Sequence, residues 1–132
     1  IQKVVLMCLF HDIGEAFTGD IPCFEKTNSD EELESQKVSA FLNSLPLPYK
    51  TELEKLFEEM EALKTDEARL YKALDNMEAV VQHNEADIST WLPLEYDLQL
   101  THGEKAVSHF GYTRRLKEEC NKITLDKIKN EK

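Results

Sequence analysis

The chain has 132 residues, enough for one domain with a hydrophobic core, and carries 26 acidic and 16 basic side chains for a net charge of −10. This charge argues against a nucleic-acid polymer as partner, because phosphate binding depends on clustered lysine and arginine. No apolar run approaches the roughly 20 residues of a membrane-spanning helix, so we expect neither a membrane span nor a signal peptide.

The first predicted helix covers residues 1–17. Val4 to Phe10 are all apolar, which is typical of a buried helix. No capping residue precedes this run, so we expect that an earlier segment of the protein precedes Ile1. Thr18-Gly19-Asp20-Ile21-Pro22 then breaks the helix and forms a loop.

His11 and Asp12 stand directly after the apolar run. Burying them without partners would be unfavourable by about 2–7 kcal/mol for a polar group and more for a charge, and a divalent metal removes that penalty. Glu15 shares a helix face with His11, and the glycine turn lets Asp20 fold back over the helix end. The alternative is a helix end solvated by its own polar residues.

Two further helices follow in the first half of the chain. Ser29 and Glu32 have the spacing of a capping box and predict a helix over residues 29–45, which Pro46-Leu47-Pro48 ends. The next helix is predicted over residues 49–64 because its apolar residues recur at helical spacing. Its opposite face is acidic and is read as solvated.

Thr65 or Asp66 is predicted to cap a helix that runs to about residue 85. Its core stripe is predicted to consist of Leu70, Leu74, Met77 and Val81. Asp75 lies beside this stripe, where it is either a surface carboxylate or a metal ligand reaching a facing helix.

The last part of the chain is predicted to begin with an irregular segment over residues 86–98. A helix over residues 100–110 follows, Gly111 breaks it, and a final helix covers residues 112–129. The sequence shows no strand-like alternation, so the predicted fold class is all-α. Cys8, Cys23 and Cys120 are odd in number and lack metal-ligand spacing, which indicates reduced thiols in a cytoplasmic protein.

Three motifs resemble the HD superfamily of metal-dependent phosphohydrolases, and specifically its 5′-deoxynucleotidase-like branch. They are His11-Asp12-x-x-Glu15, then Thr18-Gly19-Asp20-Ile21-Pro22, and finally Lys72-Ala73-Leu74-Asp75-Asn76-Met77-Glu78-Ala79. The resemblance implies an all-α HD-domain helical bundle, with residues 1–132 as a single domain that lacks its N-terminal helix or helices. The family's first metal-binding histidine would lie on that earlier segment.

The resemblance also implies one divalent metal ion, which could be Mn, Co, Fe, Zn or Mg. Carried over by motif, His11, Asp12 and Asp75 would be its ligands, while Glu15 and Asp20 would act on the attacking water and the substrate. For contacts to the substrate phosphate, Lys72, Arg114 and Arg115 are equal candidates.

The expected function is removal of phosphate from nucleoside or deoxynucleoside 5′-monophosphates. The alternatives are a non-catalytic HD-like module that regulates or senses nucleotides, and a phosphodiesterase or triphosphohydrolase of the same superfamily. Glu15 and Asp20 favour an enzyme, because metal binding alone does not require them. The partner is then a small phosphorylated molecule, and the apolar helices are compatible with a homodimer.

Overall fold

The computed structural model describes residues 1–22 and 24–131, with the backbone alone for residue 131. The described residues confirm the all-α fold class, since their regular structure is entirely helical. No helix among them has the length and apolarity to cross a membrane. The prediction for Cys23 lies outside the described residues. The chain divides into two compact units, Ile1–Leu63 and Lys64–Lys132. The single-domain interpretation stays a prediction.

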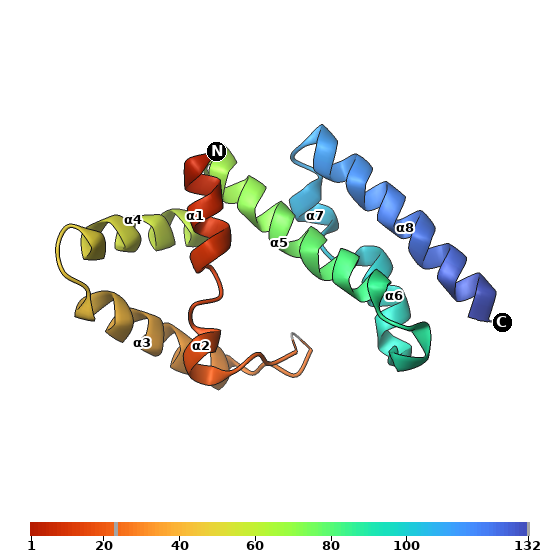
Figure 1. The fold of residues 1–132 in the computed structure, drawn as a ribbon, viewed down its shortest axis with the longest axis horizontal. Helices are drawn as coiled ribbons and strands as arrows, with labels where there is room; N and C mark the ends of the chain where they lie inside the picture. The colour runs from red at the N-terminus through yellow and green to blue at the C-terminus, as the bar shows by residue number, and fades with distance from the viewer. Residues whose placement is uncertain (23, 132) are drawn as a thin grey trace. The chain divides into compact units, whose positions relative to one another are not determined.

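The first unit contains four helices, α1 (Gln2–Phe10), α2 (Glu15–Thr18), α3 (Asn28–Ser44) and α4 (Tyr49–Ala62), as Figure 1 shows. Helix α3 packs against α2 and α4, and α1 packs against α4. The buried apolar side chains of this unit are those of Val4, Met7, Leu42, Leu56 and Met60. An ion pair of 3.0 Å between Lys3 Nζ and Glu59 Oε2 also joins α1 to α4.

The prediction of one continuous helix over residues 1–17 is wrong. After Phe10 the backbone hydrogen bonds tighten from the i−4 to the i−3 pattern, with Ile13 N–H donating to Phe10 O and Glu15 N–H to Asp12 O. The first helix is also less buried than its composition predicted. Only Val4 and Met7 are buried, whereas Val5, Leu6 and Leu9 are exposed, because the contacts of α1 within the unit lie on one side.

Helix α3 begins one residue before the predicted start, and its cap differs. Thr27 is the N-cap, and a capping box joins it to Asp30 rather than joining Ser29 to Glu32. The Asp30 carboxylate accepts a hydrogen bond of 2.9 Å from Thr27 N–H, so the threonine and the aspartate satisfy each other's backbone amides. The break at Pro46-Leu47-Pro48 and the following helix are confirmed.

The second unit contains α5 (Asp66–Glu85), the 3₁₀ helix η1 (Ile88–Thr90), α6 (Pro93–Thr101), α7 (Glu104–Val107) and α8 (Gly111–Glu131). The Thr65 hydroxyl caps α5 by accepting from Ala68 N–H, which confirms the predicted start. The irregular segment over residues 86–98 is wrong in its second half. Pro93 begins α6, and the Glu95 carboxylate accepts a bond of 2.6 Å from Leu92 N–H there. Gly111 begins α8 instead of only ending a helix.

Helices α5 and α8 run side by side in the same direction (Figure 1), with α7 also against α5. Their core consists of Ala73, Met77, Val80, Val107 and Cys120. The predicted stripe on α5 was therefore rotated from the true one. Of its four members only Met77 is buried, while Leu70 and Leu74 are half-buried and Val81 is exposed. Small Ala73 occupies the contact because it lets another helix approach closely.

Candidate active site

The His11–Asp12 pair lies at the end of α1. His11 is the C-cap residue of that helix, with its backbone N–H bonded to Met7 O. Its ring Nδ1 lies 2.7 Å from Cys8 O. Because a carbonyl oxygen only accepts, Nδ1 carries the proton in this contact. The other ring nitrogen, Nε2, lies 3.0 Å from Asp12 Oδ2.

This distance fits an ion pair with a doubly protonated His11 ring, or a cation held by both side chains. With the Nδ1 proton directed to Cys8 O, a neutral His11 presents a lone pair at Nε2, and the Asp12 carboxylate also presents lone pairs. Two acceptors at 3.0 Å repel each other unless a second ring proton or a cation is shared between them. Two metal ligands at about 2.1 Å and a right angle to each other are also about 3 Å apart. The backbone bond to Nδ1 is the orienting contact that metal-binding histidines usually have.

Glu15 is the first residue of α2 and lies one tight turn after Asp12. A 3₁₀-type turn brings residues i and i+3 into line, which places the two carboxylates in one row. Burial raises the pKa of Glu15, and the Asp12, Asp20 and Glu34 carboxylates raise it further, while Lys26 opposes them. Glu15 is thus a carboxylate that retains a proton more readily than an exposed glutamate does, as a proton-transfer group requires.

Asp20 follows a glycine turn at the end of α2. Gly19 ends α2 with φ of +83°, in the left-handed region that favours glycine. The carboxylate of Asp20 then lies within electrostatic range of Glu15, although Asp20 itself is exposed. Asp12, Glu15 and Asp20 therefore form one acidic cluster at the end of α1 and α2.

Two residues beside this cluster were missed from the sequence, Lys26 and Glu34. They form an ion pair of 2.5 Å, and both lie within electrostatic range of Glu15. Gly14 allows this approach, because a Cβ at that position would lie only 2.4 Å from Glu34 Cγ. A glycine that directly precedes Glu15 was the available signal, but Glu34 lies 20 positions further along the chain and its contact is tertiary.

Asp75 belongs to the second unit, on α5. Its Oδ2 accepts a hydrogen bond of 2.7 Å from Lys72 Nζ, one turn earlier. The Asp75 side chain retains 24% of its exposure, so it remains accessible beside the core. His102, which ends α6, lies within electrostatic range of both Asp75 and Lys72. The sequence did not predict this neighbour, since His102 is 27 positions away.

The structure thus brings His11 and Asp12 together, with Glu15 and Asp20 close by. Among residues 1–22 and 24–131, no three His, Cys, Asp or Glu side chains form a group that could hold a metal ion. The described pair supplies two donors of types that suit a divalent ion, one imidazole and one carboxylate. The convergence of Asp75 with this pair stays a prediction.

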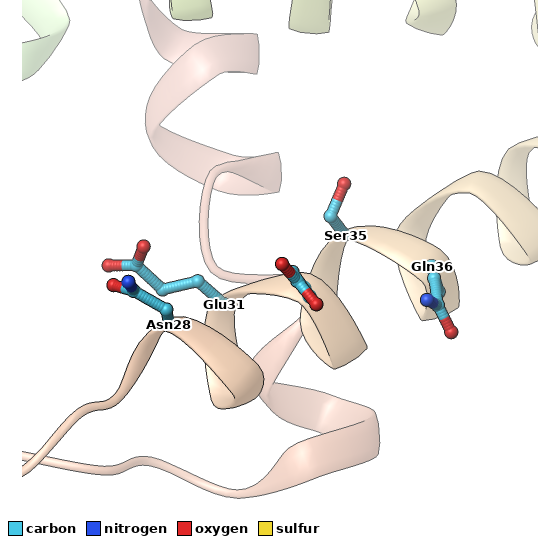
Figure 2. Close-up of a pocket in the computed structure, with 5 residues that line it drawn as sticks. Asn28, Glu31, Ser35 and Gln36 are labelled. Atoms are coloured by element: carbon cyan, nitrogen blue, oxygen red, sulfur yellow. The ribbon is translucent and has the colours of Figure 1, made fainter.

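A separate depression of about 510 Å³ lies along α3 (Figure 2). Its lining comes from that helix alone, namely Asn28, Glu31, Glu32, Ser35 and Gln36. Figure 2 shows the labelled side chains of Asn28, Glu31, Ser35 and Gln36 pointing in different directions rather than towards one centre. The depression includes none of the predicted site residues and is distinct from the acidic cluster at Glu15.

Comparison with known proteins supplies an independent line of evidence. A family model described as HD domain matches residues 1–112. The 5'-deoxynucleotidase HDDC2 of Dictyostelium discoideum is 34% identical over 83 residues, which cover 61% of this chain and 44% of that protein. The 5'-deoxynucleotidase HDDC2 of Homo sapiens is 31% identical over 86 residues, or 64% of this chain and 42% of the relative.

A fungal protein matches over a longer range. The 5'-deoxynucleotidase hdd1 of Schizosaccharomyces pombe is 27% identical over 121 residues, which cover 87% of this chain and 56% of the relative. The chain thus spans about half the length of the curated relatives it matches. No solved structure shows significant similarity to it.

Proposed function

The chain belongs to the HD domain family, in its 5′-deoxynucleotidase-like branch, and we propose that it is a metal-dependent phosphohydrolase. We further propose that it removes phosphate from deoxynucleoside or nucleoside 5′-monophosphates. The curated relatives carry the name 5'-deoxynucleotidase, which supports this substrate class. The observation that supports the proposal is the approach of His11 Nε2 to Asp12 Oδ2 at 3.0 Å, because both atoms are of types that bind a divalent ion.

In this proposal His11 and Asp12 hold the divalent ion, and Asp75 is its third ligand from this chain. Cys8 O keeps the His11 ring in the orientation that leaves Nε2 for the ion. A divalent ion, when bound, polarises the phosphoryl group, neutralises its charge and makes water more acidic. The ion explains how a chain with a net charge of −10 binds an anionic substrate.

Glu15 is proposed as the proton acceptor for the attacking water. Its pKa is raised towards the pH at which the protein works, and a general base transfers protons most effectively when these two values are close. Glu15 lies one turn beyond Asp12 in the acidic cluster. In this proposal it is not a ligand, and His11 and Asp12 bind the ion. Asp20 then either places the substrate or protonates the leaving oxygen, and both roles suit its exposed position within electrostatic range of Glu15.

The remaining expectations are predictions about the protein in its cell. The described cysteines, Cys8 and Cys120, are free thiols, which agrees with a reducing compartment such as the cytoplasm. Homodimer formation also stays a prediction.

Phosphate release tests the proposal directly. The full protein is incubated with the four common deoxynucleoside 5′-monophosphates and the matching ribonucleotides, each with Mn²⁺, Co²⁺ or Mg²⁺. We expect release that a chelator abolishes and re-added metal restores. A bis-ester and a nucleoside triphosphate test the phosphodiesterase and triphosphohydrolase alternatives. A protein that binds metal but turns over none of the monophosphates would contradict the proposal and favour the regulatory or sensing module.

A further inference from the structure

Helix α2, which begins with Glu15, depends on α3 for its position. It has only 4 residues, fewer than the roughly 12–15 that an isolated helix needs to be stable in water. The chain reaches it through a tight turn, in which Ile13 N–H donates to Phe10 O at 3.1 Å. Helix α3 packs against α2 (Figure 1), so contacts with α3 determine where Glu15 lies.

Two contacts hold this segment on α3. The centroids of the Phe17 and Phe41 rings lie 6.1 Å apart, a separation typical of aromatic pairs. The Glu34 side chain lies so close to the backbone of buried Gly14 that a Cβ there would overlap its Cγ and lie 2.8 Å from its Oε1. Glu34 and Phe41 are seven positions apart, which places them two turns apart on one face of α3. Glu15 follows Gly14 directly and so lies between the two contacts.

The contact with Glu34, and not the backbone conformation, requires glycine at position 14. Gly14 has φ of −60° and ψ of −37°, which are right-handed helical angles that any residue adopts. Alanine is favoured over glycine in such a conformation. The three nearest atoms that a Cβ would meet all belong to Glu34. Gly14 therefore lets α3 approach the residue that precedes Glu15.

Glu34 is itself held in place by Lys26. The two side chains form an ion pair of 2.5 Å and keep only 20% and 24% of their exposure, so solvent screens this pair less than a fully exposed one. The Lys26 backbone N–H donates to Pro22 O at 3.0 Å, which fixes the origin of the lysine side chain. Glu34 therefore cannot move away from Gly14 without separating from Lys26.

We propose that Glu34 is a positioning residue for Glu15. Packed against Gly14 and held by Lys26, it keeps α2 where the Glu15 carboxylate reaches the attacking water. The inference rests on the proposed function, because it takes Glu15 as the proton acceptor. Glu34 acts through the backbone of Gly14 in this role, which requires no contact with the substrate or the metal ion.

The test measures phosphate release from a deoxynucleoside 5′-monophosphate by the full protein with saturating Mn²⁺, with kcat and KM determined separately and Tm measured for each variant. We expect Glu34→Ala to lower kcat about 10–100-fold, because a displacement of about 1 Å can slow a reaction about 100-fold. KM and Mn²⁺ affinity should stay near those of the unchanged protein. Glu34→Gln keeps the length of the side chain and should recover part of kcat.

Glu59→Ala is the matched control. It removes the ion pair of 3.0 Å with Lys3, which joins α1 to α4 in the same unit, and Glu59 keeps 20% of its exposure, as Glu34 does. We expect Glu59→Ala to lower Tm and to retain kcat. If Glu34→Ala also lowers only Tm, its role is structural and the inference is wrong. A rise in KM or a loss of Mn²⁺ affinity at unchanged kcat would contradict the inference as well.

Gly14→Ala tests the same contact from the other side. The added Cβ should displace Glu34 and lower kcat by a similar factor. In the double variant with Glu34→Ala the two losses should not multiply, because the side chain that the Cβ would meet is gone. Losses that multiply in full would show that the two residues do not act through one contact, and would overturn the inference.

Glu15→Gln distinguishes the inference from the proposed function on which it rests. If Glu15→Gln loses kcat and Glu34→Ala keeps it, Glu15 acts as proposed and the role of Glu34 is wrong. If Glu15→Gln keeps full kcat, or if the unchanged protein releases no phosphate, the proposed function of Glu15 fails, and the inference fails with it.

Discussion

The arrangement of polar side chains differs between the two units of the chain. In the first unit burial raises the pKa of Glu15, the carboxylates of Asp12, Asp20 and Glu34 raise it further, and one lysine, Lys26, opposes them. In the second unit the buried side chains of Asn84 and Thr124 are paired, Asn84 with Cys120 O and Thr124 Oγ1 with Asn84 Oδ1, although the buried Nε1 of Trp91 has no hydrogen-bond partner among the described residues.

This difference separates a site from a scaffold. Paired buried groups stabilise the fold, because each donor has an acceptor and neither is left without a partner after leaving water. Crowded carboxylates oppose folding, and such conflicts are typical of residues retained for function. The comparison predicts that changes in the acidic cluster affect catalysis most, while changes in the α5–α8 core affect stability most.

The largest expected effect is on catalysis, from Glu15→Gln. We expect kcat to fall about 10²–10⁴-fold, the usual contribution of a general acid or base, with metal content nearly unchanged. Asp12→Ala should instead lose the metal, and activity with it. Metal content is measured by elemental analysis beside phosphate release, with Glu31→Gln on the exposed side of α3 as the control.

Two outcomes would contradict this assignment. A Glu15→Gln variant that loses metal as severely as Asp12→Ala does would show that Glu15 is itself a ligand. A variant that keeps both metal and full activity would show that the reaction does not pass through Glu15.

The second effect is on stability and concerns the core of the second unit. Met77 is 2% exposed between α5 and its neighbours, so Met77→Ala should lower the free energy of unfolding by about 2–5 kcal/mol. Val81→Ala, on the exposed side of the same helix, should change it by no more than about 0.5 kcal/mol. Urea unfolding of both variants gives these values. If the two variants lost similar amounts of unfolding free energy, the observed core would be contradicted and the buried stripe predicted from the sequence would be favoured.

The register of α5 shows what hydropathy can and cannot predict. The start of the helix was predictable, because the Thr65 cap is local and lies directly before the first turn. The buried face was not, because it contains Ala73 and Asn84 in place of Leu70 and Val81. Alanine is buried here through close helix contact, and Asn84 is buried because Cys120 O and Thr124, far along the chain, satisfy its amide.

The residues of the candidate site also fall into two groups, those predictable from a local motif and those that depend on tertiary contacts. His11, Asp12, Glu15 and Asp20 lie within ten residues, so a local motif was enough to identify them. Lys26 and Glu34 enter only through tertiary contacts, and Gly14, which lies against Glu34, was the only local sign of them. The break of the first helix after Phe10 was also missed, because residues 11–14 contain no proline, and His11 and Gly14 keep right-handed helical backbone angles.

A third prediction tests the paired network of the second unit. Asn84→Ala removes the hydrogen bonds to Cys120 O and from Thr124 Oγ1, at 3.1 Å and 2.9 Å. Losing a partner of a buried group is unfavourable by about 1–3 kcal/mol, and we expect this loss in urea unfolding. Phosphate release by the folded variant should be retained, in contrast to Glu15→Gln. Gln82→Ala, exposed on the same helix, is the control. An unchanged free energy of unfolding for Asn84→Ala would show that the network does not stabilise this unit.

The smallest expected effect is an increase in stability. Most substitutions lower the Tm, but Glu15→Gln should raise the Tm of the metal-free protein. The folded-state pKa of Glu15 is raised above its ordinary value of 4.5, first by burial and then by Asp12 and Asp20. The folded protein therefore binds this proton more tightly than the unfolded chain does. The stability that the protonated group contributes is fully present below pH 4.5 and is lost as pH rises through the raised folded-state pKa.

Glutamine does not titrate, so the Tm of Glu15→Gln should exceed that of the unchanged protein by more at pH 7 than at pH 4. Both proteins are measured with a chelator present, and Glu31→Gln controls for the loss of one charge. A Tm difference that stays constant with pH, or that falls as pH rises, would show that the acidic cluster is not under electrostatic strain, and the contrast between the two units would then lose its physical basis.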